Sequence, residues 1–338
     1  MICRCLFGVR GISAFLGVLL SIALGCSPNS GGNIPKNAVK EPGVAADATD
    51  TTSLKEQVSP KTQIAAPLKL VIGVNEIYCK NTACKCAQHV ATRTYEPLQK
   101  RLKEKFAIDL ELRYYPEDTF TLHKDIKAGK LDGALAKPWS ILKSARESGR
   151  NYLRIADLKG PNGTSALRGV VVVKRDSPIR DWPDMKGKRV ALGESDGYEK
   201  HYAALTLLQK HGIAPSPKDR IEFSGCIESI GALLDGKADV AIISDYAFDA
   251  DCLVDIASKD DFRVLGQTDP PIPQTSLLLD RSRVSNDVAQ RLRRALLELA
   301  GDAELQASLL GDGFTRPAPW SPSELPAIAE KKQAEEKE

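Results

Sequence analysis

The sequence lacks an excess of charge of either sign. Its 47 lysines and arginines stand against 44 aspartates and glutamates, which gives a net charge of +3. A protein that binds nucleic acid through the phosphate backbone normally presents a strongly basic surface. We therefore expect no nucleic-acid partner.

The chain also lacks the patterns that would indicate an enzyme or a haem protein. No Cys-x-x-Cys-His arrangement occurs in it, which excludes covalent haem attachment. We find no Ser-His-Asp arrangement and no pair of carboxylates placed for acid-base catalysis. The sequence therefore predicts a protein that is not an enzyme.

An apolar run long enough to span a bilayer comfortably is missing at the N-terminus. The uncharged run at residues 11–24 follows Arg4 and Arg10, and its length is that of a signal-peptide core. It ends in "IALG" before Cys26, which resembles a bacterial lipobox, where the cysteine is acylated and becomes the new N-terminus. We expect residues 1–25 to be a lipoprotein signal peptide and Cys26 to anchor the protein on the periplasmic side of a bacterial membrane. Plain secretory cleavage that leaves Cys26 unmodified stays open.

Large apolar side chains are scarce in two further segments. Residues 26–67 are rich in Ser, Thr, Pro, Gly and charge, and residues 323–338 are highly charged. Such segments cannot bury enough apolar surface to offset the entropy that folding costs them. We expect a disordered tether at 26–67 and a flexible tail at 323–338.

Between these ends, strand-type and helix-type patterns alternate. Strands are expected at 68–74, 108–115, 131–136, 152–158, 168–175, 188–194, 221–225 and 238–244, and helices at 94–106, 119–129, 139–149, 197–212, 226–236, 247–257, 286–300 and 303–310. Alternation of this kind predicts parallel sheets with helices on both faces. We therefore expect an α/β protein.

The chain is expected to cross between two lobes twice, near residues 164–178 and again near the proline-rich stretch 267–280. Lobe 1 then comprises 68–167 plus 275–322, and lobe 2 comprises 168–274. Two lobes joined by two segments form a hinge around a cleft, and open α/β sheets bind ligands at the carboxyl ends of their strands.

One long segment resembles part of a known protein family. Residues 170–216, which include "RDSPI", "DMKGK" and "ALGESDG", resemble the entry to the second lobe in type 2 periplasmic binding proteins of the phosphonate, phosphite and phosphate transporter family. Residues 95–106, 126–136 and 233–245 are similar to three further family segments. The resemblance implies the two-lobed type 2 periplasmic-binding-protein fold. It also implies a non-catalytic receptor that delivers a small anionic solute to an ABC permease in the inner membrane.

The expected ligand contacts lie at strand ends or in segments that match the family. They are Asn75, Tyr78, Lys137, Trp139, Ser195, Asp196, Gly197, Tyr198, Cys226, Asp245 and Tyr246. In the family, donors at a helix N-terminus hold the anionic oxygens, and residues 195–197 correspond to that place. Here Asp196 and Glu199 add negative charge, which Lys200 and His201 can offset only if they face the cleft.

The stretch "YCKNTACKCAQH" at residues 78–89 leaves alternatives open. Cys79, Cys84, Cys86 and His89 offer ligands for zinc or copper, which is the basis of an alternative function as an extracytoplasmic metal-binding or redox protein. An oxidising compartment instead favours disulfides among these cysteines, Cys226 and Cys252, and free thiols are the third alternative. A bridge from this loop to Cys226 would lock the cleft, so we do not expect it. For the receptor itself we expect no cofactor.

Overall fold

A computed structural model describes residues 66–83, 87–116, 119–195, 197–249, 253 and 256–320. The predicted signal peptide, Cys26, nearly all of the predicted tether and the tail beyond residue 320 lie outside this part of the chain. All described residues belong to the compact unit Pro60–Glu338. Among them, no helix combines the length and the apolar character that crossing a membrane requires.

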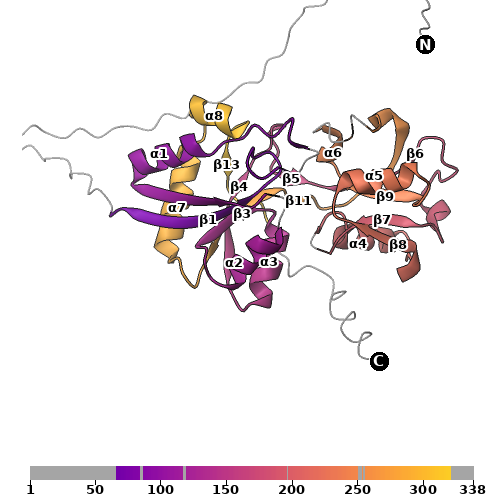
Figure 1. The fold of residues 1–338 in the computed structure, drawn as a ribbon, viewed down its shortest axis with the longest axis horizontal. Helices are drawn as coiled ribbons and strands as arrows, with labels where there is room; N and C mark the ends of the chain where they lie inside the picture. Colours follow the sequence, from indigo (N-terminus) through magenta and orange to yellow (C-terminus); the bar gives the residue numbers. More distant parts are fainter. Residues whose placement is uncertain are drawn as a thin grey trace, which may run out of the picture. The chain divides into compact units, whose positions relative to one another are not determined.

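The first sheet has the strand order β13-β4-β12-β3-β1-β2 and, with its helices, forms lobe 1 (Figure 1). Its strands are β1 (Leu68–Asn75), β2 (Ile108–Tyr114), β3 (Gly133–Ala136), β4 (Tyr152–Leu158), β12 (Thr275–Asp280) and β13 (Phe314–Thr315). Its helices are α1 (Glu96–Phe106), α2 (Thr119–Lys127), α3 (Pro138–Glu147), α7 (Asn286–Glu298) and α8 (Ala303–Leu309).

Side chains of β1 alternate between two apolar cores, one on each face of this sheet. Leu70, Ile72 and Val74 pack in the core that α1, α7 and α8 cover, whereas Val71 packs against the core of α2 and α3. Helix α1 begins after Tyr95, two residues later than the expected start at 94, and Tyr95 makes no side-chain cap. Pro97 lies in the first turn, where no amide donor is needed.

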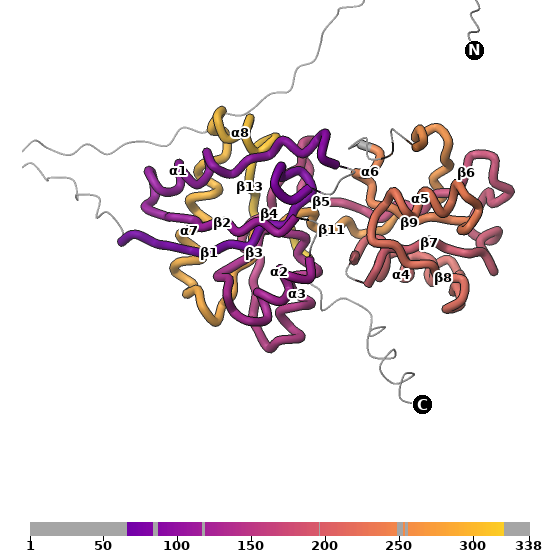
Figure 2. Tube along the Cα trace, in the orientation of Figure 1, coloured from indigo at the N-terminus to yellow at the C-terminus, as the bar shows by residue number. Residues whose placement is uncertain are grey.

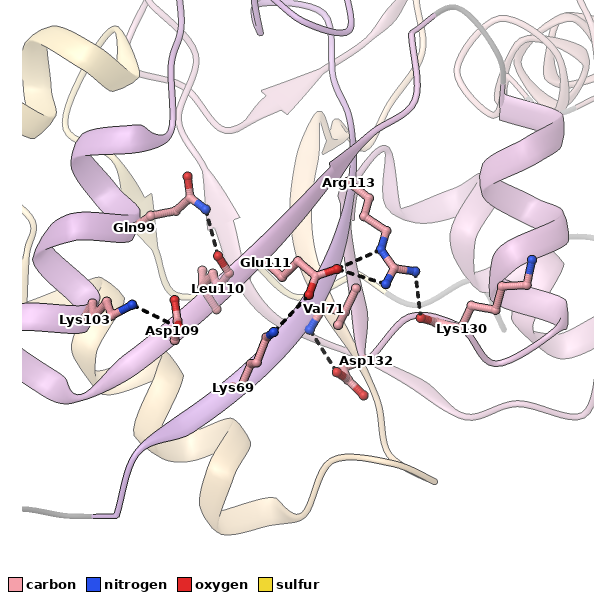
Figure 3. Close-up of polar contacts among 10 residues, drawn as sticks. All are labelled: Lys69, Val71, Gln99, Lys103, Asp109, Leu110, Glu111, Arg113, Lys130 and Asp132. Carbon is pink, nitrogen blue, oxygen red and sulfur yellow. Dashed lines mark hydrogen bonds and ion pairs between the residues drawn. The ribbon is translucent and has the colours of Figure 1, made fainter.

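Charged side chains occupy the outer strand β2, which has no neighbour beyond it in the sheet (Figure 3). The Glu111 carboxylate lies 3.2 Å from the Lys69 ammonium of β1 and 2.9 Å from the Arg113 guanidinium. Asp109 pairs with Lys103 of α1 at 3.2 Å. Charges on an edge strand oppose pairing with another chain, so this edge is protected.

The second sheet has the strand order β10-β6-β9-β7-β8 and belongs to lobe 2. Its strands are β6 (Gly169–Lys174), β7 (Val190–Gly193), β8 (Arg220–Phe223), β9 (Val240–Ser244) and β10 (Phe262–Gln267). Helices α5 (Cys226–Leu234) and α6 (Tyr246–Asp249) contribute to one core, and α4 (Tyr202–Lys210) contributes to the other.

The prediction of parallel sheets is correct for only part of each sheet. Strand β1 runs parallel to β2 and β3, and β7 runs parallel to β8 and β9. In contrast, β12 and β13 of lobe 1 and β6 and β10 of lobe 2 pair antiparallel with their neighbours. A segment that leaves one lobe at the carboxyl edge of its sheet enters the other lobe at the carboxyl edge of the second sheet. It therefore runs antiparallel to the strands that end at that edge.

Two segments carry the chain between the lobes, and they pair with each other (Figure 2). Strand β5 (Ala166–Leu167) lies between β4 and β6, and β11 (Ile272–Pro273) lies between β10 and β12. The two strands are antiparallel, and the Gln274 backbone N–H donates to the Ser165 carbonyl at 2.8 Å. The connection is therefore a two-stranded ribbon.

Two helices differ from their predicted bounds by more than two residues. The helix expected at 197–212 is α4, which begins only at Tyr202, because residues 198–201 form turns. The helix expected at 247–257 is the short α6. Residues 250–252 and 254–255 lie outside the described part of the chain.

Candidate functional site

The loop after β1 is held by a buried ion pair. The Glu76 carboxylate lies 2.9 Å from the Arg93 guanidinium, and the two side chains are 0% and 1% exposed. The Tyr95 hydroxyl and the Tyr78 backbone N–H also donate to Glu76, each at 3.1 Å. Two further N–H groups of Arg93 donate to the carbonyls of Leu309 and Lys159. A buried carboxylate needs such partners, so this network fixes the shape of the loop.

The cysteine-rich stretch lies in this loop. Cys79 is 1% exposed and belongs to the apolar core of lobe 1. Burial raises the pKa of its thiol, which therefore stays protonated at neutral pH. Cys79 and Cys226 are both free, so a disulfide that includes either of them is wrong.

The metal alternative stays a prediction. Cys84, Cys86 and Cys252 lie outside the described residues. Within the part that the structure does describe, no three His, Cys, Asp or Glu side chains are grouped so that they could hold a metal ion.

A cleft of about 850 Å³, open to solvent, is lined by both lobes and by the ribbon that joins them. Lobe 1 contributes the loop after β1, the start of α2 and the start of α3, whereas lobe 2 contributes the ends of β7, β8 and β9. The lining residues are Asn75, Glu76, Ile77, Thr82, Thr119, Lys137, Ser140, Gly197, Lys200, Ser224, Tyr246, Gln274 and Thr275. Most of them are polar, as expected where strand ends face a shared cleft.

An ion pair joins the two lobes at the cleft. The ammonium of Lys137, the residue before α3 in lobe 1, lies 2.6 Å from the carboxylate Oε1 of Glu199 in lobe 2. The Ser244 hydroxyl, at the end of β9, donates to the same oxygen at 2.7 Å. The Glu199 side chain is 1% exposed, whereas that of Lys137 is 33% exposed. Lys137 therefore faces the cleft and Glu199 lies behind it.

The two charges in this pair shift each other's pKa. Burial acts to raise the pKa of Glu199, but the ammonium groups of Lys137 and Lys200 and the hydrogen bonds from Lys137 and Ser244 outweigh it and lower the pKa to about 2. Burial acts to lower the pKa of Lys137, and the negative charge of Glu199 overcomes this and raises it. Both groups are ionised at neutral pH.

Lys200 and Tyr246 complete the lobe 2 side of the cleft. The Lys200 ammonium donates to the Ser224 carbonyl at 2.9 Å, and the methylenes of its side chain pack on Gly193. The Tyr246 ring lies 5.3 Å from the Lys137 ammonium, a cation-π distance. Burial raises the pKa of the Tyr246 hydroxyl, which keeps its proton and can donate a hydrogen bond.

Aromatic rings make a second contact between the lobes. Trp139 of α3 lies 5.3 Å from Tyr198 and 5.3 Å from Tyr202, centroid to centroid, and both tyrosines belong to lobe 2. Trp320, the last described residue, lies 5.9 Å from Tyr198. A second, much smaller cavity is lined by Trp139, Tyr198, Trp320, Glu199 and Lys137. Lys137 is thus shared between this cavity and the cleft.

The predicted contacts separate into groups. Asn75, Lys137, Gly197 and Tyr246 line the cleft, and Trp139 and Tyr198 line the smaller cavity. Ser195 is a described residue that lines neither, and Asp196 lies outside the described part.

Three predicted contacts have structural partners instead. Tyr78 is buried, with its ring under the Arg93 guanidinium at 5.5 Å. Cys226 is not in a loop facing the cleft: it opens α5, packs in the lobe 2 core, and its Sγ lies 3.4 Å from the Ser244 backbone nitrogen, within hydrogen-bond reach. The Asp245 carboxylate accepts from the backbone N–H of Arg168, next to β5, at 2.9 Å.

The expectation that the sequence contains no pattern of an enzyme is wrong at one place, because residues 193–197 read Gly-x-Ser-x-Gly, a pattern also seen at nucleophile elbows. An elbow requires a helix directly after the serine, but α4 begins only at Tyr202. His201 has its Nδ1 2.7 Å from the Gly193 carbonyl. Because α4 begins only at Tyr202, neither Ser195 nor Gly197 lies at the helix N-terminus that the resemblance suggests for an anion.

Several lining residues were not among the predicted contacts: Glu76, Ile77, Thr82, Thr119, Ser140, Lys200, Ser224, Gln274 and Thr275. Glu76 and Ser224 directly follow β1 and β8, and the rule that ligands bind at strand ends could have found them. Thr119 and Ser140 lie in the first turns of helices that reach the cleft only through tertiary packing. No local signal marks them.

A family model described as the periplasmic substrate-binding protein of phosphonate ABC transporters matches residues 86–325. No curated protein matches the sequence.

Solved structures share the fold at low identity. The protein XAC2383 from Xanthomonas citri, bound to ATP, is 19% identical with a TM-score of 0.57, covering 79% of this chain and 94% of that one. PhnD1 from Prochlorococcus marinus, in complex with methylphosphonate, is 13% identical with a TM-score of 0.55, covering 80% and 100%. A binding protein component of an ABC phosphonate transporter from Pseudomonas aeruginosa is 16% identical with a TM-score of 0.54, covering 74% and 82%.

The architecture fits the matched family. Two α/β lobes joined by a two-stranded ribbon enclose a polar cleft, and similar structures include a binding protein component of an ABC phosphonate transporter. The match covers most of the chain. The chain belongs to the family of periplasmic substrate-binding proteins of phosphonate ABC transporters.

Proposed function

We propose that this protein is a lipid-anchored receptor that captures a small oxyanion of the phosphonate, phosphite or phosphate type and presents it to an ABC permease. The lobes close on the ligand about the β5–β11 ribbon. The observation that carries the proposal is that two ammonium groups line one cleft, Lys137 from lobe 1 and Lys200 from lobe 2. Cations from both lobes favour an anion that bridges them, since each lobe alone offers only half of the site.

Further donors support an oxyanion. The hydroxyls of Thr119, Ser140, Ser224, Tyr246 and Thr275 belong to lining residues, and oxyanions are bound by several such donors at once. Methylphosphonate in PhnD1, and chloride and ATP in XAC2383, are anions held by proteins of similar fold. We propose no catalytic step and no cofactor.

The anchor is part of the proposal. Cys26 follows a signal-type apolar run, and 41 residues of polar chain, 27–67, separate it from β1. A chain of that composition lets the binding domain move away from the membrane surface while remaining attached. An intact mass that shows acyl groups on Cys26 in protein extracted from membranes would support the anchor, and an unmodified Cys26 would refute it.

Thermal unfolding tests the ligand class. We expect phosphate, phosphite or methylphosphonate at ~100 times its Kd to stabilise the domain by about 2.7 kcal/mol, which raises its melting temperature by a few degrees. Lys137→Gln and Lys200→Gln should each abolish this shift, because each removes one of the two cations.

Lys237→Gln is the matched control, since Lys237 is 71% exposed and does not line the cleft. It should leave the shift intact. If no anion raises the melting temperature while zinc or copper does, the receptor proposal fails and the metal-binding alternative replaces it.

A further inference from the structure

The charges around the cleft almost cancel. The charged lining residues are Lys137, Lys200 and Glu76. Glu76 is neutralised by Arg93 at 2.9 Å, and Lys137 is neutralised by Glu199 at 2.6 Å. Among the described residues that line the cleft, Lys200 is therefore the one cation without a carboxylate in direct contact. Counted over these described residues, Lys137, Lys200 and Arg93 against Glu76 and Glu199, the charge is about one net positive.

Glu199 is enclosed by groups from several elements. Lys137 approaches from lobe 1, Ser244 from the end of β9, and Lys200 is the next residue along the chain. Tyr246 of α6 and Cys226 of α5 lie close enough to interact electrostatically with Lys137, and Tyr246 also interacts with Glu199. This carboxylate has no access to solvent, so its charge is weakly screened and acts on whatever Lys137 binds.

The backbone fixes Glu199 in place. Its carbonyl lies over Gly169, at the start of β6, so closely that a Cβ at that glycine would stand 2.2 Å from the oxygen. The carboxylate Oε2 has no hydrogen-bond partner among the described residues. Glu199 therefore keeps one acceptor oxygen without a partner among the described residues, and the residue lines the small cavity that adjoins the cleft at Lys137.

We propose that Glu199 is a specificity-determining residue that acts through Lys137 and makes the cleft select singly charged oxyanions over doubly charged ones. The proposal rests on the oxyanion-receptor function proposed above. A monoanion neutralises the one net positive charge of the cleft, whereas a dianion brings a second negative charge towards the buried Glu199 carboxylate. A monoanionic phosphonate also keeps one hydroxyl as a donor, which a dianion lacks.

The ligand's own titration provides the test. A phosphoryl group of this type loses its second proton near neutral pH, so methylphosphonate is largely a monoanion at about pH 6 and a dianion at about pH 9. Isothermal titration calorimetry would measure its Kd at both pH values for the wild type and for Glu199→Gln. We expect the wild-type Kd to be about tenfold higher at the higher pH, because like charges repel in the partly buried site. In Glu199→Gln this ratio should fall to about one or below.

The ratio of the Kd values at the two pH values separates the effect of the Glu199 charge from a purely structural effect of the substitution. A purely structural loss of the Lys137–Glu199 link would change the Kd by the same factor at both pH values, whereas loss of the charge changes the ratio. Ser244→Ala removes a neutral hydrogen bond to the same carboxylate and should keep the wild-type ratio. A wild-type Kd that does not rise with pH, or an unchanged ratio in Glu199→Gln, would overturn the proposal.

Two further outcomes are distinguishable. If the wild type binds no phosphonate, phosphite or phosphate at either pH, the oxyanion-receptor function itself fails. If Glu199→Gln does not fold, the wild type can be tested at about pH 9 with methanesulfonate, which has the shape of methylphosphonate but one charge fewer. Tighter binding of methanesulfonate would support the selection of monoanions, and tighter binding of methylphosphonate would refute it.

Discussion

At the scale of single residues, the buried charged side chains have two different roles, one in holding the structure and one in contacting a ligand. Glu76 and Arg93 are both shielded from solvent, and their partners among the described residues hold the loop after β1. Lys137 is also paired, but one third of its side chain is exposed to the cleft. Exposure to the cleft, and not burial, therefore separates a charge that can meet a ligand from one that only shapes the site.

Replacing Arg93 by methionine tests the structural role of the first pair. The substitution leaves the Glu76 carboxylate buried without its cation, so we expect the free energy of unfolding to fall by about 3–5 kcal/mol. Equilibrium unfolding in urea measures the change. Lys69→Met is the control, because it breaks an exposed ion pair with Glu111 and should cost only about 0–1 kcal/mol. Equal losses in the two variants would contradict the role assigned to Arg93.

At the scale of elements, the strand β6 depends on a glycine where the lobes meet. A Cβ at Gly169 would lie 2.2 Å from the Glu199 carbonyl oxygen, which is backbone and cannot rotate away. The lack of a side chain at Gly169 therefore allows the turn that contains Glu199 to pack against the first residue of β6. The position of the Glu199 side chain therefore depends on the packing of this turn against β6.

Gly169→Ala should consequently impair both stability and binding. We expect a loss of about 1–3 kcal/mol in the free energy of unfolding, since the added methyl group forces the backbone at residue 199 to move. The same movement should weaken ligand binding, as measured by calorimetry.

Gly231→Ala in α5 is the matched substitution, because a Cβ there would have no atom within 4 Å. It should stabilise the protein by up to about 1 kcal/mol through helix propensity and leave binding unchanged. If Gly169→Ala behaved like Gly231→Ala, the close contact at residue 199 would not constrain the site.

Most elements were predictable from the sequence because their patterns are local. The strand at 152–158 and the start of the helix at 286 were predicted at the observed positions, since apolar periodicity and, for Ser285, a capping side chain mark them. The start of α4 was predicted five residues too early. Residues 198–201 have helix-compatible side chains, and their turns are set by contacts with Gly169 and Lys137 that lie far away in the sequence.

At the scale of the whole molecule, Lys137 and Glu199 link two lobes that the chain itself joins only through the β5–β11 ribbon. The aromatic contact of Trp139 with Tyr198 and Tyr202 lies beside this ion pair. Ion pairing across a hinge depends on pH, because it is lost when the carboxylate is protonated.

The pH dependence of stability tests this link. The folded-state pKa of Glu199 is lowered to about 2 from an ordinary value near 4.5, so its contribution is fully present above about pH 4.5 and is lost as the pH falls through about 2. We expect Glu199→Gln to be less stable than the wild type at about pH 6, and this difference to shrink towards zero at about pH 2. Urea unfolding at several pH values measures it.

Glu104→Gln is the control, since it changes an exposed carboxylate on α1. Its stability should follow the wild type within about 0.5 kcal/mol over the same pH range. A difference between Glu199→Gln and the wild type that stayed constant down to the lowest pH would show that the carboxylate is not ionised in the folded protein.

The sequence by itself determined the α/β class, most helix and strand positions and the two-lobed plan, because apolar periodicity and turn residues act over a few positions along the chain. It also placed Lys137 and Tyr246 at strand ends, where ligands bind in such folds. Only the tertiary structure decided the antiparallel strands, the burial of Tyr78, Cys79 and Cys226, and the pairing of Lys137 with Glu199. These features depend on which distant segments meet, and the free energy of burying a charge is set by the partner that it finds there.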